Sequence, residues 1–189
     1  MAVIQPTIIS EFKTEGEIQH ALIKRGAMFD WTKNEVVAIN TTIGGFESDL
    51  IVVNKNRFMS EVEIKTSLED FRRDRLKKRW STNSTTEPRK YFYYAFPRNV
   101  ALKIDLNELP KSSGLIAVWD EYRYVGLING YYPVTKSMVL KTPEKLPCFR
   151  RVNESELVSL YRLMAYRFHS VSEKHFDHMR DCRFAIENR

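Results

Sequence analysis

Two short segments separated by a polar turn constrain the fold of this chain more than any other feature. Asp49 to Val53 is an apolar, β-branched run, and Phe58 to Lys65 alternates between apolar and charged residues. An alternation with a period of two is typical of a strand that buries one of its faces. Asn54 to Arg57 has the composition of a turn, so the two segments predict a β-hairpin.

The length of this turn decides which side chains face one another. A two-residue turn would place Asp49 opposite Val62, whereas a three-residue turn places Asp49 opposite Glu63. Asn56 suits the left-handed conformation that the longer turn requires. The longer turn also groups five apolar side chains on one face, and a one-residue slip would break the group. These side chains are Leu50, Val52, Phe58, Val62 and Ile64.

The other face of the hairpin would then carry two carboxylates and an ammonium group. Because neighbouring strands lie about 4.8 Å apart, Asp49 and Glu63 can share one metal ion, and Mg²⁺ prefers such oxygen ligands. Lys65 shares this face and can orient or deprotonate an attacking water, or neutralise charge on a phosphate. Glu61 is expected to support the site or to face solvent. The competing interpretation is a solvated strand face with an ordinary ion pair, and the spacing alone favours this competing interpretation.

The elements expected around the hairpin indicate a single α/β domain with a mixed sheet. Thr14 to Glu17 has the form of a capping box and predicts a helix to about Arg25. Strands are expected over residues 35–43 and 91–96, with a second hairpin over 114–128 that turns at Asp120 and Glu121. Further helices are expected over residues 67–80, over residues 153–168 and after residue 172. We expect one domain over residues 1–189, with a core at about 11–130 and a helical extension at about 150–189.

The charge of the chain suits a polyanionic partner. The formal net charge is +6 and the sequence pI is about 9.3. Residues 71–90 carry eight basic and two acidic side chains. The net charge of this segment, 8 − 2 = +6, equals that of the whole chain. The helix expected there places arginines within its apolar arc. Arg72, Arg75 and Lys78 are therefore predicted to contact DNA phosphates, with local pairs to Asp70 or Asp74 as the alternative.

Two further properties favour a cytosolic protein without a membrane partner. No apolar run approaches the roughly 20 residues that cross a bilayer. The two cysteines are too few for a disulfide framework, so a reducing bacterial or host-cell cytosol is expected.

The hairpin and its flanks resemble a known nuclease superfamily. Ser48-Asp49, thirteen intervening residues and then Glu63-Ile64-Lys65 look like the PD-(D/E)XK signature, with Ser48 in place of the proline. The wider pattern is similar to the MmcB-like DNA-repair proteins and to related phage or bacterial endonuclease-like proteins. The resemblance covers about residues 11–119 and rests on segments 61–65, 67–71, 91–97 and 114–116.

This resemblance implies a restriction-endonuclease-like core and a metal-dependent endonuclease that hydrolyses DNA. Asp49, Glu63 and the main-chain carbonyl of Ile64 would bind Mg²⁺ or Mn²⁺, and Lys65 would position the water. Glu17 matches a further carboxylate from the first helix, although its role in the capping box is an equal alternative, and Glu15 is the less favoured substitute. The competing functions are a non-catalytic nucleic-acid-binding protein and a protein-interaction module with the same fold.

Overall fold

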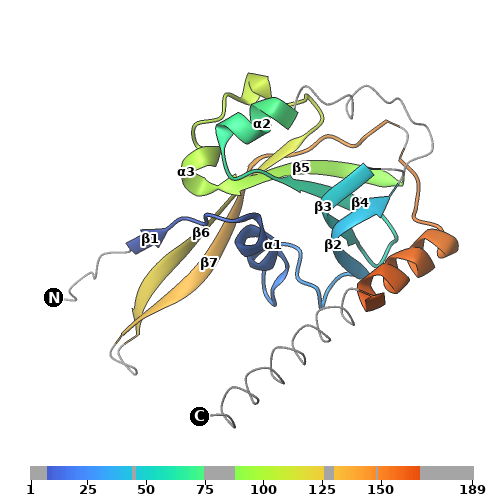
Figure 1. The fold of residues 1–189 in the computed structure, drawn as a ribbon, viewed down its shortest axis with the longest axis horizontal. Coiled ribbons are helices and arrows are strands. Elements are labelled where there is room, and N and C mark those ends of the chain that lie inside the picture. Colours follow the sequence, from blue (N-terminus) through green and yellow to red (C-terminus); the bar gives the residue numbers. More distant parts are fainter. Residues whose placement is uncertain (1–7, 44–45, 75–87, 126–129, 148, 167–189) are drawn as a thin grey trace, which may run out of the picture. The chain divides into compact units, whose positions relative to one another are not determined.

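The computed structural model describes residues 8–43, 46–74, 88–125, 130–147 and 149–166. The chain divides into two compact units, Met1–Val152 and Asn153–Arg189. The first unit is built on a seven-stranded mixed sheet with helices packed on it (Figure 1), which confirms the predicted α/β class. Among the described helices, none is long and apolar enough to span a membrane.

The first unit consists of strands with short helices inserted between some of them. They are β1 (Ile8–Ser10), α1 (Glu15–Ile23), β2 (Val36–Ile43), β3 (Phe46–Val53), β4 (Met59–Ile64), α2 (Leu68–Asp74), β5 (Arg89–Pro97), α3 (Arg98–Ala101), the 3₁₀-helix η2 (Leu106–Glu108), β6 (Gly114–Val125) and β7 (Gly130–Lys141). The strands lie in the order β1-β6-β5-β4-β3-β2, and β7 also pairs with β6. The pairs β4–β5 and β5–β6 are parallel and all other described pairs are antiparallel.

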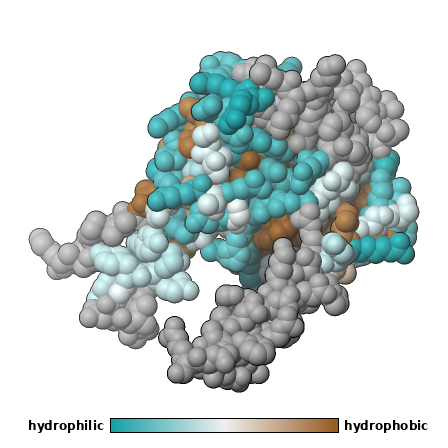
Figure 2. All heavy atoms as spheres, viewed as in Figure 1, coloured by the Kyte–Doolittle hydropathy of each residue, from teal (hydrophilic) through white to brown (hydrophobic). Residues whose placement is uncertain are grey.

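Each face of the sheet buries its own hydrophobic cluster. Ile18, Ala21 and Leu22 of α1 pack on one face with side chains from the central strands, which include Leu50, Val52, Val62 and Ile64. On the other face, Phe71 of α2 and Ala101 of α3 pack with Phe92, Tyr94 and Phe96 of β5. The surface shown in Figure 2 is mostly hydrophilic, with hydrophobic residues in small separate patches.

The three-residue turn of the β3–β4 hairpin is confirmed. Asn54 N–H donates to the Phe58 carbonyl at 3.0 Å, which encloses the three residues between them. The left-handed residue is Arg57, with φ 62°, and not Asn56 as expected. The Asn54 side chain explains this difference, since its Oδ1 accepts the N–H groups of Asn56 and Phe58 and fixes how the turn starts.

Phe58 does not join the apolar face that the sequence predicted for it. Its ring packs edge-to-face on Phe149, with centroids 5.7 Å apart, and Lys90 Nζ lies 3.9 Å from its centroid. The end of the hairpin is thus covered by residues that are distant in sequence, which a local pattern does not reveal.

The second predicted hairpin turns at a different place. Asp120 and Glu121 lie within β6, opposite Thr135 and Val134 of β7, and the connection falls at residues 126–129, outside the described ones. Both carboxylates are satisfied inside the strand. Asp120 Oδ1 accepts from the Thr135 hydroxyl at 2.6 Å, and Glu121 Oε2 accepts from Arg123 at 3.1 Å. The acidic pair therefore does not need a solvated turn.

Three helices start where the capping signals predicted, whereas α3 and η2 were not predicted. Thr14 and Glu17 form the capping box of α1, and Ser67 Oγ accepts from Asp70 N–H at the start of α2. In the second unit, residues 154–166 are helical and Asn153 forms a capping box with Glu156. The predicted continuation of α2 to residue 80 and the predicted final helix after residue 172 lie outside the described residues.

Candidate active site

The predicted register of β3 and β4 is confirmed, and the two strands separate at Asp49. Leu50 pairs with Val62 and Ile51 pairs with Glu61, so Asp49 is level with Glu63. The ladder ends at Leu50, and the Asp49 carboxylate instead accepts the N–H of Ile64 at 2.7 Å. The side chain therefore lies at the fork between the two strands, half-buried beside the end of β4.

Glu63 and Lys65 form a buried ion pair next to this fork. Lys65 Nζ lies 2.8 Å from Glu63 Oε1, and Lys65 and Glu63 are only 6% and 4% exposed, respectively. Lys65 N–H donates to the Ala95 carbonyl of β5, which fixes the backbone that carries the ammonium group. The competing interpretation is confirmed in its Glu63–Lys65 ion pair but wrong in its solvated face, because both side chains are buried within the protein.

Burial and neighbouring charge raise the pKa of Asp49 to about 7. Burial has the largest effect and the negative charge of Glu63 the next, while the N–H of Ile64 opposes both by stabilising the carboxylate. The charge of Glu15 raises the pKa further and that of Lys65 lowers it. At a pH equal to this pKa about half of the molecules carry a proton on Asp49, which an incoming cation would displace.

Glu15, and not Glu17, is the acidic residue of α1 that lies near this cluster. Glu17 Oε2 accepts the N–H groups of Lys13 and Thr14, each at 2.9 Å, and these bonds lower its pKa. Of the two roles left open for Glu17, the helix cap is the one observed. Burial raises the pKa of Glu15, and the charges of Lys65 and Glu63 also act on it.

A glutamine that the sequence interpretation missed ties α1 to the fork. Gln19 is 6% exposed, and its Nε2 lies 3.0 Å from Glu15 Oε1, 2.5 Å from Asn40 Oδ1 and 3.0 Å from the main-chain oxygen of Asp49. Asn40 has a left-handed φ of 45° inside β2. Glu15 and Gln19 are four residues apart and share one helix face, which was the available signal.

Glu61 has a different role from Glu63, although both lie on β4. Its Oε1 accepts from the Ser48 hydroxyl at 2.8 Å, and its Oε2 accepts from Arg89 at 2.6 Å. Glu61 is 4% exposed, so the solvent-facing alternative is wrong. The guanidinium of Arg89 balances its charge inside the protein, as expected of a supporting residue.

The predicted DNA-binding residues are described only in part. Arg72 forms two hydrogen bonds of 3.2 Å with Glu108, which raise its pKa, and its side chain is 58% exposed. Its partner is thus a residue of η2 rather than a neighbour on the same helix. Arg75 and Lys78 lie outside the described residues. Contact between these cations and DNA stays a prediction.

The donor atoms at the fork fit a hard divalent cation. Asp49 and Glu63 offer carboxylate oxygens, which Mg²⁺ and Mn²⁺ prefer, and burial followed by the charge of Glu63 raises the pKa of Asp49. Within the described ranges, no group of three or more His, Cys, Asp or Glu side chains is arranged to hold a metal ion. A site here would therefore rely on two carboxylates, completed by main-chain oxygen and water.

Comparison with known proteins gives a likeness in fold only. No family model matches the chain, and no curated protein matches it. One solved structure, the SPO1766 protein of unknown function from Silicibacter pomeroyi, is similar with a TM-score of 0.46 and 15% sequence identity. The match covers 75% of this chain and 80% of that chain.

Proposed function

We propose that this protein is a metal-dependent DNA endonuclease of the PD-(D/E)XK type with a restriction-endonuclease-like core. The observation that carries the proposal is the buried Glu63–Lys65 pair beside Asp49, whose pKa is raised to about 7. Strongly shifted carboxyl groups with a defined charge partner are typical of functional sites. The mixed sheet with helices on both faces supports the fold assignment.

Asp49, Glu63 and the Ile64 carbonyl would hold Mg²⁺ or Mn²⁺. The ion, when bound, would polarise a phosphate oxygen and lower the pKa of a water molecule. Lys65 would position that water and donate hydrogen bonds to the phosphate oxygens on which negative charge develops. Glu63 holds the Lys65 ammonium at 2.8 Å and so fixes its direction. Gln19 fixes the backbone of Asp49, and Glu15 adds a further carboxylate near the cluster.

A non-catalytic nucleic-acid-binding protein is the second candidate. It is favoured by one feature of the cluster, since Asp49, Glu63 and Lys65 each already have a hydrogen-bond partner within the protein. Lys65 pairs with Glu63, and Asp49 accepts the N–H of Ile64. Such a closed arrangement is also expected where the fold is kept and the chemistry is lost.

Cleavage by matched variants separates the two candidates. Wild-type protein, Lys65→Ala and the exposed-lysine control Lys33→Ala are incubated with single-stranded, duplex and branched DNA and with RNA, in Mg²⁺, Mn²⁺ or EDTA. We expect Lys65→Ala to cleave DNA at least about 100-fold more slowly than wild type, because positioned proton-transfer groups contribute about 10²–10⁴-fold. Lys33→Ala should match wild type.

Two results would contradict the nuclease proposal. Equal cleavage by wild type and Lys65→Ala would place the activity elsewhere. DNA binding by wild type without cleavage of any substrate would favour the second candidate.

A further inference from the structure

A cavity of about 470 Å³ lies between the C-terminal end of α1 and strand β7. Its walls come from the last turn of α1, the loop that follows it and the middle of β7. Lys24, Arg25, Gly26, Met28, Thr135 and Ser137 are among the residues that line it. A smaller cavity of about 320 Å³ adjoins it and shares Lys24 and Thr135.

The larger cavity is positively charged. Lys24, Arg25 and Lys136 line it, and none of its described lining residues is acidic. Arg25 is exposed and forms no ion pair with any residue in the described part of the chain. Thr135 and Ser137 add two hydroxyl groups, and they project from the same side of β7 because strand side chains alternate. Because the Thr135 hydroxyl donates its proton to Asp120 Oδ1, the three cations and the Ser137 hydroxyl form the donor set that suits a phosphate group.

A hydrogen-bond chain holds Lys24 in place across the cavity. Its ammonium donates to the Thr135 hydroxyl, and this hydroxyl donates to Asp120 Oδ1 at 2.6 Å. Asp120 lines the smaller cavity and not the larger one. The carboxylate at the end of this chain is therefore separated from Lys24 by one hydroxyl group, so the positive charge stays available to a ligand.

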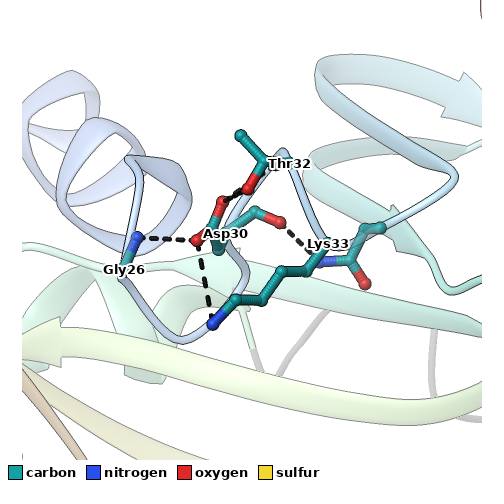
Figure 3. A network of polar contacts seen from close by, with 5 residues as sticks. Gly26, Asp30, Thr32 and Lys33 are labelled. Carbon is teal, nitrogen blue, oxygen red and sulfur yellow. Dashed lines mark hydrogen bonds and ion pairs between the residues drawn. The ribbon is translucent and has the colours of Figure 1, made fainter.

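The loop that forms the other wall is fixed by the buried carboxylate of Asp30 (Figure 3). Asp30 accepts the Gly26 N–H at 2.7 Å, the Thr32 N–H at 2.8 Å and the Thr32 hydroxyl at 2.7 Å. The Gly26 bond is the largest cause of a pKa lowered to about 2. The carboxylate is thus committed to its own loop, and the wall is built before a ligand arrives.

The cavity and the candidate active site lie at opposite ends of α1. Lys24 follows Glu15 by nine residues, which corresponds to about 14 Å along a helix. This length equals about four nucleotides of a B-form strand. Gly16 and His20, which are exposed, occupy the helix face between them. A Cβ added at Gly16 would meet no atom within 4 Å, so the surface there is open.

We propose that this cavity binds a backbone phosphate of the nucleic-acid strand, with Lys24, Arg25 and Ser137 as its ligands and Thr135 as the residue that positions Lys24, while the strand crosses α1 from the candidate active site. The inference rests on the proposed function, because it names where the substrate strand is held. It adds a second contact region to the one predicted at Arg72, Arg75 and Lys78.

The test measures DNA binding in EDTA, where metal-dependent cleavage is absent. Full-length wild type, the double variant Lys24→Gln/Arg25→Gln and a charge-matched control, Lys111→Gln/Lys145→Gln, are titrated with a labelled single-stranded oligonucleotide at several salt concentrations. A plot of the logarithm of the DNA-binding constant against the logarithm of the salt concentration has a negative slope. We expect this slope to become shallower by about 0.7 for each phosphate that the protein no longer neutralises, in the cavity variant only. Thr135→Val should weaken binding without changing the net charge.

Several outcomes would overturn the inference. These are absence of DNA binding by wild type, or equal slopes for the cavity and control variants. Shifts of the Lys24 and Arg25 resonances with inorganic phosphate, together with an unchanged DNA slope, would instead indicate a site for a small phosphate. Thermal unfolding checks that the variants fold, and Arg25→Gln alone serves if the double variant does not.

The binding titration and the cleavage assay together separate this inference from the nuclease proposal. If wild type cleaves nothing but the cavity variant loses salt dependence, the phosphate site stands and the nuclease proposal falls. If Lys65→Ala abolishes cleavage while the cavity variant binds like the control, the reverse holds.

Discussion

Strand β4 buries two carboxylates on the same face, and their surroundings differ in charge. Glu61 is met by the guanidinium of Arg89 and the hydroxyl of Ser48, so one negative charge faces one positive charge. Glu63 is met by the ammonium of Lys65, but shares its neighbourhood with Asp49 and Glu15. Three carboxyl groups thus share the charge of the Lys65 ammonium.

The difference separates a pair that is balanced in charge from a cluster with an excess of negative charge. Both pairs cost desolvation energy, but only the second has more carboxyl groups than its lysine can balance. Burial of Asp49, followed by the negative charge of Glu63, raises the pKa of this carboxyl to about 7, so it gains a proton more readily than an exposed aspartate. A divalent cation would supply the missing charge at this cluster, whereas Arg89 already supplies it at Glu61.

Breaking the balanced pair should have the largest effect on stability. Arg89→Ala would leave Glu61 buried without its guanidinium, and loss of one partner from a buried pair costs about 3–5 kcal/mol. Urea denaturation should show this loss in the free energy of unfolding. Arg72→Ala is the control, since its pair with Glu108 is exposed and such pairs contribute about 1 kcal/mol or less. Equal losses in the two variants would contradict the comparison.

Adding a divalent cation should stabilise the protein through the cluster around Glu63. A ligand present at about 100 times its dissociation constant stabilises the folded state by about 2.7 kcal/mol. We therefore expect Mg²⁺ or Mn²⁺ to raise the melting temperatures of wild type and of Glu61→Gln by similar amounts. Asp49→Asn should lose the increase. A rise of the same size in Asp49→Asn would show that the cation binds elsewhere.

The pH dependence of stability should distinguish Asp49 from Glu61, with a smaller effect than in the two experiments above. The folded-state pKa of Asp49, about 7, lies above its ordinary value of 3.8. Its protonated form therefore contributes stability that is fully present below pH 3.8 and is lost as the pH rises through 7, by at most about 1.4 kcal/mol per pH unit. In EDTA, denaturation of Asp49→Asn between pH 5 and 8 should show a shallower decline than wild type. Glu61→Gln should retain the decline, and a decline that persists unchanged in Asp49→Asn would assign it to another group.

The hairpin could be predicted because its determinants are local. Turn length and the grouping of Leu50, Val52, Val62 and Ile64 select one register, and that register is observed. The capping box of α1 is equally local, since Thr14 and Glu17 lie three residues apart. The left-handed position was assigned to the wrong residue because the side chain of Asn54 bonds to the turn and shifts it to Arg57.

The features that were not predicted depend on contacts between distant segments. Burial of the charged face requires β5 and α2, which follow the hairpin in sequence. Arg72 pairs with Glu108, thirty-six residues away, so no spacing rule applies. Asp120 lies inside a strand because Thr135 of β7 satisfies it. Glu15, rather than Glu17, is the α1 carboxylate whose charge acts on Asp49, because the cap turns the Glu17 carboxylate back toward Lys13 and Thr14.

The parallel pairing of β4 with β5 sets the order in which the site can mature. The β3–β4 hairpin joins neighbouring residues, whereas the ladder from Ser60–Tyr91 to Ile64–Ala95 closes a loop of about thirty residues. Non-local pairings form later than local ones because loop-closure entropy is lost first. During synthesis the hairpin can pair as it emerges, but Lys65 gains its buried position only once β5 has joined the sheet. A growing chain would therefore carry the hairpin before the buried cluster exists, and the cluster would form only after β5 (Arg89–Pro97) had been synthesised.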